Sequence, residues 1–141
     1  MNYNYLNYRI IIAGSRDFTD YDLLKDMLIS FIDSLPKSAQ IEIISGTARG
    51  ADSLGEQLAK EIGYTLKRFP ADWERLGKKA GYIRNNEMAE YASGAIGYLF
   101  AFWDGQSKGT EHMINLAHKH GLTVHVINYK ELDKQQEEIE M

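Results

Sequence analysis

The sequence contains no cysteine. It can therefore form no disulfide and no thiolate zinc site, and it has no cysteine nucleophile. No apolar run approaches the roughly 20 residues that a transmembrane helix needs, and the first residues lack the basic start and apolar stretch of a signal peptide. These absences predict a cytoplasmic protein that does not enter a membrane.

A strong excess of basic residues is also missing. The chain holds 16 basic and 20 acidic residues, for a net charge of −4. The acidic tail at residues 130–141 contributes most of this charge, so the rest of the chain is close to neutral. Proteins that bind duplex DNA mainly through its phosphates are usually much more basic. A local basic patch stays open as an alternative, because four basic residues lie in or near the loops described below: Arg16, Arg49, Arg84 and Lys108.

Short apolar segments alternate with amphipathic ones along the 141 residues. The apolar segments predict five strands, at residues 8–13, 41–44, 64–69, 95–102 and 122–127. The amphipathic segments predict four helices, at residues 20–35, 51–62, 82–92 and 110–120. Residues 72–79 fit either a loop or a short helix, and the tail after Tyr129 fits a frayed end or a loose helix.

This alternation predicts an α/β fold with a single Rossmann-like domain at residues 1–129, followed by a charged tail at residues 130–141. Strands that read as continuous apolar runs indicate a mainly parallel sheet covered by helices on both faces. Right-handed crossovers make 3-2-1-4-5 the leading order of the five strands. In that order the first and fourth strands flank the switch point of the sheet, so the loops at residues 14–17 and 104–110 should face each other.

Four glycine-rich or polar turns each follow a predicted strand directly. They lie at residues 14–17, 45–52, 70–73 and 103–110. Loops of this kind gather along one edge of an open α/β sheet, where ligands bind. Small residues let backbone amides come close to an anion, and helix N-termini add favourable partial charge. The turns therefore predict a site for a phosphate-bearing ligand.

Three charged side chains near these turns fit a ligand, but each also fits a structural role. Arg16 can form a two-pronged bond to phosphate or remain a solvated arginine in a turn. Asp52 could touch the ligand or cap the helix at residues 51–62. Arg84 shares a helical face with Met88 and Tyr91, so it could reach the site or pair with a buried carboxylate.

Other polar and aromatic residues leave similar alternatives. Ser107 and Thr110 offer hydroxyls to an anion at a helix start, or they simply cap the helix. Trp73 and Trp103 could stack on a base or belong to the core. The four histidines show no metal-binding pattern, and we expect neither a metal nor a cofactor.

Taken together, four motifs resemble those of the SLOG superfamily, and most closely its YpsA/YspA-like branch of small single-domain proteins. The motifs are AGSR at residues 13–16, SGTARGAD at 45–52, RNNEM at 84–88 and GT at 109–110. Each is weak alone, but the four in this order are specific, and the resemblance covers roughly residues 9–128. It implies a Rossmann-like fold with a pocket for a nucleotide or nucleotide-derived ligand. By this resemblance the phosphates are lined by Gly14, Ser15, Gly46, Gly50, Gly109 and Thr110.

The wider superfamily includes cytokinin-activating phosphoribohydrolases, the single-strand DNA binder DprA, molybdenum-cofactor carriers and sensor domains for NAD-derived signals. The phosphoribohydrolases resemble the pattern P-G-G-x-G-T-x-x-E, whose glutamate is catalytic together with an arginine on a nearby helix. Here Arg84 matches that arginine, but Met113 stands at the position of the glutamate. Glycoside hydrolysis needs a carboxylate in register, so cleavage would require Asp104 or Asp72 to substitute.

We therefore expect a protein that senses or sequesters a nucleotide-derived ligand, such as an ADP-ribose derivative or a cyclic nucleotide. One alternative is phosphoribohydrolase-like cleavage of nucleoside monophosphates, with Arg84 catalytic. Another is binding of single-stranded nucleic acid through Trp73, Trp103 and the local arginines. The resemblance also implies a homo-oligomer, because relatives often pair through helices around the pocket. The expected ligand-binding residues are Gly14, Ser15, Arg16, Ser45, Gly46, Thr47, Arg49, Gly50, Asp72, Arg84, Asn85, Asp104, Ser107, Gly109 and Thr110.

Overall fold

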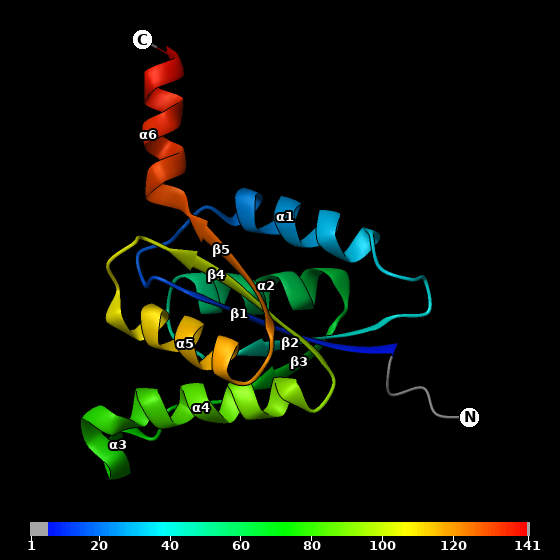
Figure 1. The fold of residues 1–141 in the computed structure, drawn as a ribbon, viewed down its shortest axis with the longest axis vertical. Helices are drawn as coiled ribbons and strands as arrows, with labels where there is room; N and C mark the ends of the chain where they lie inside the picture. The colour runs from blue at the N-terminus through cyan, green and yellow to red at the C-terminus, as the bar shows by residue number, and fades with distance from the viewer. Residues whose placement is uncertain (1–5, 141) are drawn as a thin grey trace.

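The computed structural model describes residues 6–140, and its centre is a five-stranded parallel sheet (Figure 1). The strand order is β3-β2-β1-β4-β5, which confirms the prediction. β1 and β4 are neighbours at the centre, and the pairing runs from Tyr8 opposite Ile96 to Gly14 opposite Phe102. The strands are β1 (Asn7–Gly14), β2 (Gln40–Ser45), β3 (Thr65–Arg68), β4 (Ile96–Trp103) and β5 (Thr123–Asn128).

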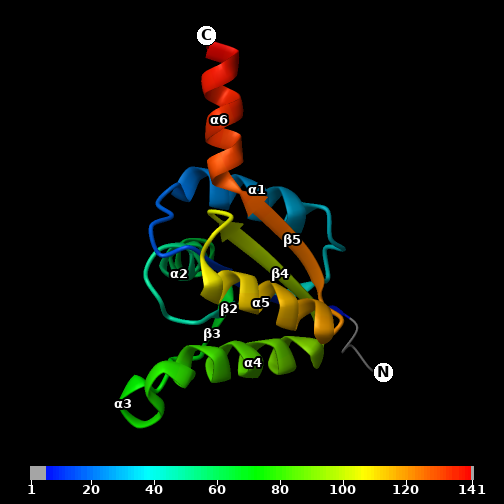
Figure 2. The same ribbon diagram turned by 60° about the vertical axis from the view of Figure 1, so that its left-hand side comes forward.

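Helices cover both faces of this sheet (Figure 2). Because successive residues of a strand point to opposite faces, Ile10 and Ile12 of β1 pack with α1 and α2, whereas Ile11 and Ala13 pack with α4 and α5. The part of a central strand that is covered on both sides must be apolar, as β1 is at its four buried residues, 10–13. The four covering helices are α1 (Tyr21–Asp33), α2 (Ala51–Ile62), α4 (Ala80–Ser93) and α5 (Lys108–Lys119).

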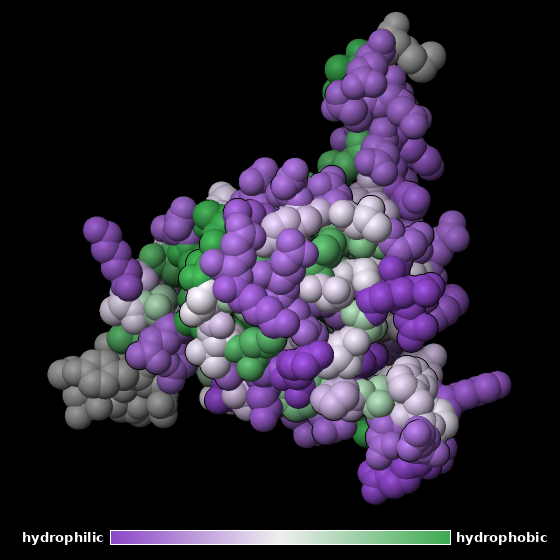
Figure 3. Space-filling model, turned by 180° about the vertical axis from the view of Figure 1, so that it is seen from behind, coloured by the Kyte–Doolittle hydropathy of each residue, from purple (hydrophilic) through white to green (hydrophobic). Residues whose placement is uncertain are grey.

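Two regions that the sequence left open are helical. Residues 72–79 contain the short helix α3 (Trp73–Leu76) and a single 3-10 turn, η2 (Gly77–Lys79). The tail forms α6 (Tyr129–Glu140), which extends away from the sheet in Figures 1 and 2. Figure 3 shows that α6 is hydrophilic over most of its visible surface. No helix within residues 6–140 combines the length and apolarity needed to cross a membrane.

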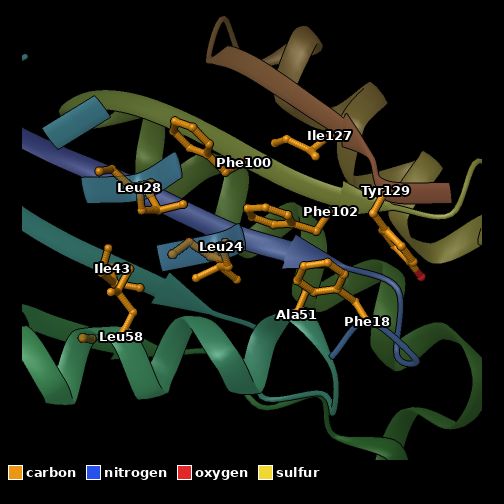
Figure 4. Close-up of a cluster of buried hydrophobic side chains, with 13 residues drawn as sticks. Phe18, Leu24, Leu28, Ile43, Ala51, Leu58, Phe100, Phe102, Ile127 and Tyr129 are labelled. Atoms are coloured by element: carbon orange, nitrogen blue, oxygen red, sulfur yellow. The ribbon is translucent and has the colours of Figure 1, made fainter. Parts of the chain in front are cut away.

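An aromatic cluster anchors the loop that leaves β1 (Figure 4). Phe18 is almost completely buried, and its ring centroid lies 5.0 Å from that of Phe102 on β4 and 4.8 Å from that of Tyr129. The Tyr129 hydroxyl donates a hydrogen bond to Asp17 Oδ1 at 2.8 Å. Buried aromatic pairs of this kind stabilise a protein by more than the apolar area they bury. Residues 15–18 are therefore held in one position at the end of the sheet.

Candidate functional site

The loops after β1, β2 and β4 surround a hollow at the carboxyl edge of the sheet, at the predicted switch point. It has a volume of about 510 Å³ and is called the inner hollow below. In Figure 1, α3 lies at the same end of the molecule as these loops. The predicted site residues that line this hollow are Gly14, Ser15, Arg16, Arg49, Arg84, Asn85, Asp104, Ser107, Gly109 and Thr110.

The two central loops are joined to each other through Gly14 and Ser15. A Cβ atom on Gly14 would lie 2.1 Å from the carbonyl oxygen of Phe102, so only glycine fits there. The Ser15 amide donates to that same oxygen at 2.9 Å, and Ser15 Oγ accepts from the Asp104 amide at 3.0 Å. Ser15 Oγ also lies 3.1 Å from Ser107 Oγ. The Ser15 hydroxyl therefore holds the rim of the hollow together.

Asp104 organises the turn that leads into α5. Its Oδ1 accepts from the amides of Gln106 and Ser107 at 2.9 and 2.8 Å, and both of its oxygens lie 2.9 Å from Ser107 Oγ. Burial acts to raise the pKa of Asp104, but the bonds from Ser107 and Gln106 outweigh it and hold this pKa below its ordinary value. The carboxylate is thus held in place by donors of its own loop.

The N-terminus of α5 faces the inner hollow without a side-chain cap. Ser107 occupies the capping position, but its hydroxyl makes no capping bond to the helix. The first amides of a helix have no partner within the helix, so those of Lys108, Gly109 and Thr110 are available to a ligand. The helix begins at Lys108 rather than at the predicted Thr110, which brings Gly109 into this first turn.

Gly50 fixes the second loop against the first. Its φ is +79°, and a Cβ atom there would lie 2.3 Å from the carbonyl oxygen of Ser15 and 2.6 Å from that of Arg16. The next residue, Ala51, donates its amide to Ser15 O at 3.4 Å. Gly50, a predicted phosphate-lining residue, does not line the inner hollow. Its role is to let two loops approach closely.

Two further predicted residues lie outside the inner hollow. Ser45 is fully buried, and its hydroxyl donates to Glu56 Oε2 at 2.7 Å while Glu56 pairs with Arg68 at 3.1 Å. Asp72 caps α3 through a bond from the Arg75 amide at 3.2 Å and forms an ion pair with the Arg75 side chain at 3.1 Å. The side chains of Ser45 and Asp72 are therefore both engaged in contacts within the protein.

Gly46 and Thr47 line a second hollow next to the first. It has a volume of about 470 Å³, is called the outer hollow below, and is also lined by Ala71. Thr47 has a φ of +65°, a left-handed conformation that a β-branched residue rarely adopts. Its amide donates to Ser45 Oγ at 3.0 Å, so the buried serine supports the unusual backbone.

Arg84 combines the two roles that the sequence left open, a place in the site and a position beside a buried carboxylate. It lines the inner hollow, and it also lies near the buried carboxyl of Asp52. Its Nη1 donates to the carbonyl oxygen of Gly46, and its Nε donates to Asn85 Oδ1 at 3.0 Å. Burial lowers the pKa of Arg84, and Asp52 acts against this effect. The guanidinium is therefore held in place with part of its donor capacity directed at the hollow.

Asp52 is only 5% exposed and lines the inner hollow. Its Oδ2 accepts from the Ala48 amide at 3.2 Å, so the structure favours a local loop contact over simple capping by its side chain. Burial raises the pKa of Asp52 to about 6, although the Ala48 amide and Arg84 both act to lower it. Near neutral pH this carboxyl sits close to its titration point inside the site.

The shifted pKa predicts how stability depends on pH. Because the pKa is higher in the folded state, the folded protein binds the Asp52 proton more tightly than the unfolded chain does. This binding adds to the free energy of unfolding at low pH, and the added stability is lost as the pH rises from about 4 to about 6. Relative to wild type, Asp52→Asn should therefore gain about 2 kcal/mol of unfolding free energy between pH 4 and 7. Urea unfolding at several pH values measures this difference. Asp133→Asn on α6 is the control, and a pH-independent difference for Asp52→Asn would contradict the assignment.

The wall of the inner hollow contains residues that the sequence did not single out. Tyr82 and Lys78 come from α4 and η2. Met113 of α5, which the sequence did single out, is buried and also lines the hollow. Of the two tryptophans, Trp73 lines both hollows and is 50% exposed. Trp103 instead donates its indole N–H to Ser107 O at 3.1 Å, which is a structural role.

Asn85 links the two helices on this side of the sheet. Its Nδ2 lies 3.3 Å from Gly109 O and 3.2 Å from His112 Nδ1. The His112 ring meets the Tyr82 ring edge-on at 4.5 Å, and burial lowers the pKa of His112. These contacts fix the start of α5 against α4, and so they position the helix amides relative to Arg84.

Comparison with known proteins gives two matches. The sequence model of the YspA, cpYpsA-related SLOG family (YAcAr) matches residues 8–76. These residues include β1, β2 and the loops that follow them. "Gene 61 protein" of Mycobacterium phage D29 is 35% identical over 121 residues, which cover 82% of this chain and 93% of the phage protein. No solved structure matches the chain.

Proposed function

The chain belongs to the YspA, cpYpsA-related SLOG family, and from this premise we propose that it binds a phosphate-bearing, nucleotide-derived ligand in the inner hollow. Membership of the family suggests, at a general level, nucleotide-related binding or processing. The proposal is more specific in three respects. It names phosphate as the group recognised, the inner hollow as the place, and binding without cleavage as the outcome.

The observation that carries the proposal is the convergence of three arginines. Arg16 follows β1, Arg49 follows β2 and Arg84 lies on α4, yet all three line the inner hollow together with the uncapped start of α5. Arginine binds phosphate through paired hydrogen bonds, and a helix N-terminus favours negative charge. Like charges are costly to gather, and the carboxylates of the same lining offset them only in part: with Lys78 there are four basic groups against Asp17, Asp52 and Asp104. An anionic ligand would supply the remaining negative charge.

The apolar part of the inner hollow fits a nucleobase. Met88 and Met113 form a buried surface, and Tyr82 and Trp73 add partly exposed aromatic rings. Ligand sites commonly combine such apolar walls with a few placed polar groups. A nucleoside monophosphate or a larger derivative would place its base here and its phosphate at the arginines.

Met113 favours binding over hydrolysis. It faces the inner hollow from α5, so the position that holds a glutamate in the phosphoribohydrolase pattern carries no carboxylate. Asp104 is bonded to Ser107 and Gln106, and Asp52 is almost completely buried. Cleavage of an N-glycosidic bond needs a carboxylate that can reach the sugar or a water. The third carboxylate of the lining, Asp17, accepts a hydrogen bond from the Tyr129 hydroxyl, so each of the three is already held by a donor of the protein itself.

Calorimetric titration tests this proposal with AMP, ADP, ADP-ribose and a cyclic nucleotide, with adenosine as the control that lacks phosphate. We expect measurable binding of the phosphate-bearing compounds and no binding of adenosine at the same concentrations. Absence of binding across the panel at millimolar concentration would reject the proposal. Release of free base from AMP that is lost in Arg84→Ala would show a phosphoribohydrolase instead. Preferential binding of a single-stranded oligonucleotide would show a nucleic-acid binder.

A further inference from the structure

The three arginines stand between two hollows rather than at the end of one. Arg16, Arg49 and Arg84 line both the inner and the outer hollow. Ala48 and Trp73 are shared in the same way, so the two spaces adjoin over this set of residues. A phosphate bound by the arginines would therefore have room on both sides.

The outer hollow differs from the inner one in its chemistry. Its lining among the described residues contains the three arginines, small residues, Thr47 and Trp73, but no carboxylate. The inner hollow has the apolar surface of Met88 and Met113. A base fits the inner side, whereas a hydroxyl-bearing group fits the outer side, where a threonine hydroxyl and an aromatic ring are available.

Thr47 supplies an independent observation at the outer hollow. Its left-handed backbone costs roughly 1–2 kcal/mol for a residue with a Cβ atom, and glycine would adopt it without this cost. Strained residues of this kind cluster at ligand sites. Thr47 lines the outer hollow, and a contact between its hydroxyl and a ligand would account for threonine here.

We propose that the ligand carries its phosphates internally, as a diphosphate diester with a nucleoside in the inner hollow and a second, hydroxyl-bearing group in the outer hollow. This inference rests on the proposed function, because it concerns the same arginines. It separates the ligand classes that the proposed function leaves together. A nucleotide with a terminal phosphate, or a cyclic mononucleotide, would leave the outer hollow empty.

The comparison of ADP with ADP-ribose tests this inference directly. ADP carries more negative charge, so recognition of a terminal phosphate by the arginines would favour ADP. If the phosphates are internal, the second ribose adds contacts in the outer hollow, and ADP-ribose should bind about tenfold more tightly, a gain of about one good hydrogen bond. The affinities are measured by calorimetry on the full chain at one pH and one salt concentration.

A substitution that fills the outer hollow provides a second test of the inference. Ala71 lines the outer hollow but not the inner one. Ala71→Leu should therefore lower the affinity for ADP-ribose to that for ADP and leave ADP binding unchanged, while Ala71→Ser should leave both affinities unchanged. Thr47→Gly should weaken ADP-ribose binding without lowering the melting temperature, because glycine relieves the backbone strain.

The outcomes of these measurements separate the two proposals. Equal or tighter binding of ADP, with no effect of Ala71→Leu, would overturn the internal-phosphate inference and leave the proposed function in place. Failure of every nucleotide to bind would reject the proposed function itself. Tighter binding of a short single-stranded oligonucleotide than of ADP-ribose would also overturn the inference, because the two hollows would then hold neighbouring nucleotides of a polymer.

Discussion

Arg84→Met is expected to weaken binding of the phosphate-bearing ligand by about 100-fold, since loss of one partner from a desolvated, hydrogen-bonded charge pair costs about 2–5 kcal/mol. Arg84 is the least exposed of the three arginines, and its guanidinium is already oriented by Gly46 O and Asn85. A preoriented group loses little side-chain entropy on binding. Calorimetric titration of the variant with ADP-ribose measures the loss.

Arg75→Met is the matched control for this experiment. Arg75 lies on α3 near the same end of the molecule, but it is exposed and paired with Asp72, so its loss should change affinity by less than threefold. Arg84→Lys keeps the charge without the planar donor group and should give an intermediate loss. An Arg84→Met protein with an unchanged melting temperature and wild-type affinity would show that the phosphate lies elsewhere.

Gly50→Ala is expected to reduce the free energy of unfolding by about 3 kcal/mol or more, because overpacking adds to the cost of a positive-φ backbone that glycine alone adopts readily. The added methyl group would lie 2.3 Å from Ser15 O and 2.6 Å from Arg16 O. These are backbone atoms, so relief requires the loops after β1 and β2 to separate. The variant should lose ligand affinity as well, because Arg16 and Arg49 lie on those loops.

Gly63→Ala provides a control with a positive φ and no neighbours; its ψ of +25° places it in the left-handed helical region, whereas Gly50 has a ψ of −130°. Gly63 has a φ of +94° at the end of α2, and nothing lies within 4 Å of its added Cβ atom. Its substitution should reduce the free energy of unfolding by only about 1 kcal/mol, which is the cost of the left-handed conformation alone. Urea unfolding of both variants measures the difference. Equal losses would show that the contact between the two loops does not contribute to stability.

The sheet order and the place of the hollow could be predicted because they follow from the alternation of strands and helices. Continuous apolar strands require cover on both faces, and right-handed crossovers then leave few topologies. Once the order is fixed, the ends of β1 and β4 must meet. The glycine-rich and polar turns at those ends predicted where the hollow would lie without any knowledge of side-chain contacts.

The direction of individual side chains could not be predicted in the same way. Ser45 is the last residue of β2 and turns into the protein toward Glu56, a choice that depends on how α2 packs. Asp72 caps a short helix that the sequence left ambiguous. Lys78 and Tyr82 line the inner hollow because η2 and the first turn of α4 lie beside the loops after β1 and β4. That placement is set by packing between distant segments, which periodicity does not record.

The bonds that join Ser15, Asp104 and Ser107 also bear on the kinetics of ligand capture. Because the loops after β1 and β4 are joined by the protein's own hydrogen bonds, the inner hollow is already formed in the protein without ligand. Little chain freedom is then lost on docking. Association should follow a single fast phase whose rate rises in proportion to ligand concentration, without the plateau that a slow closing step would impose.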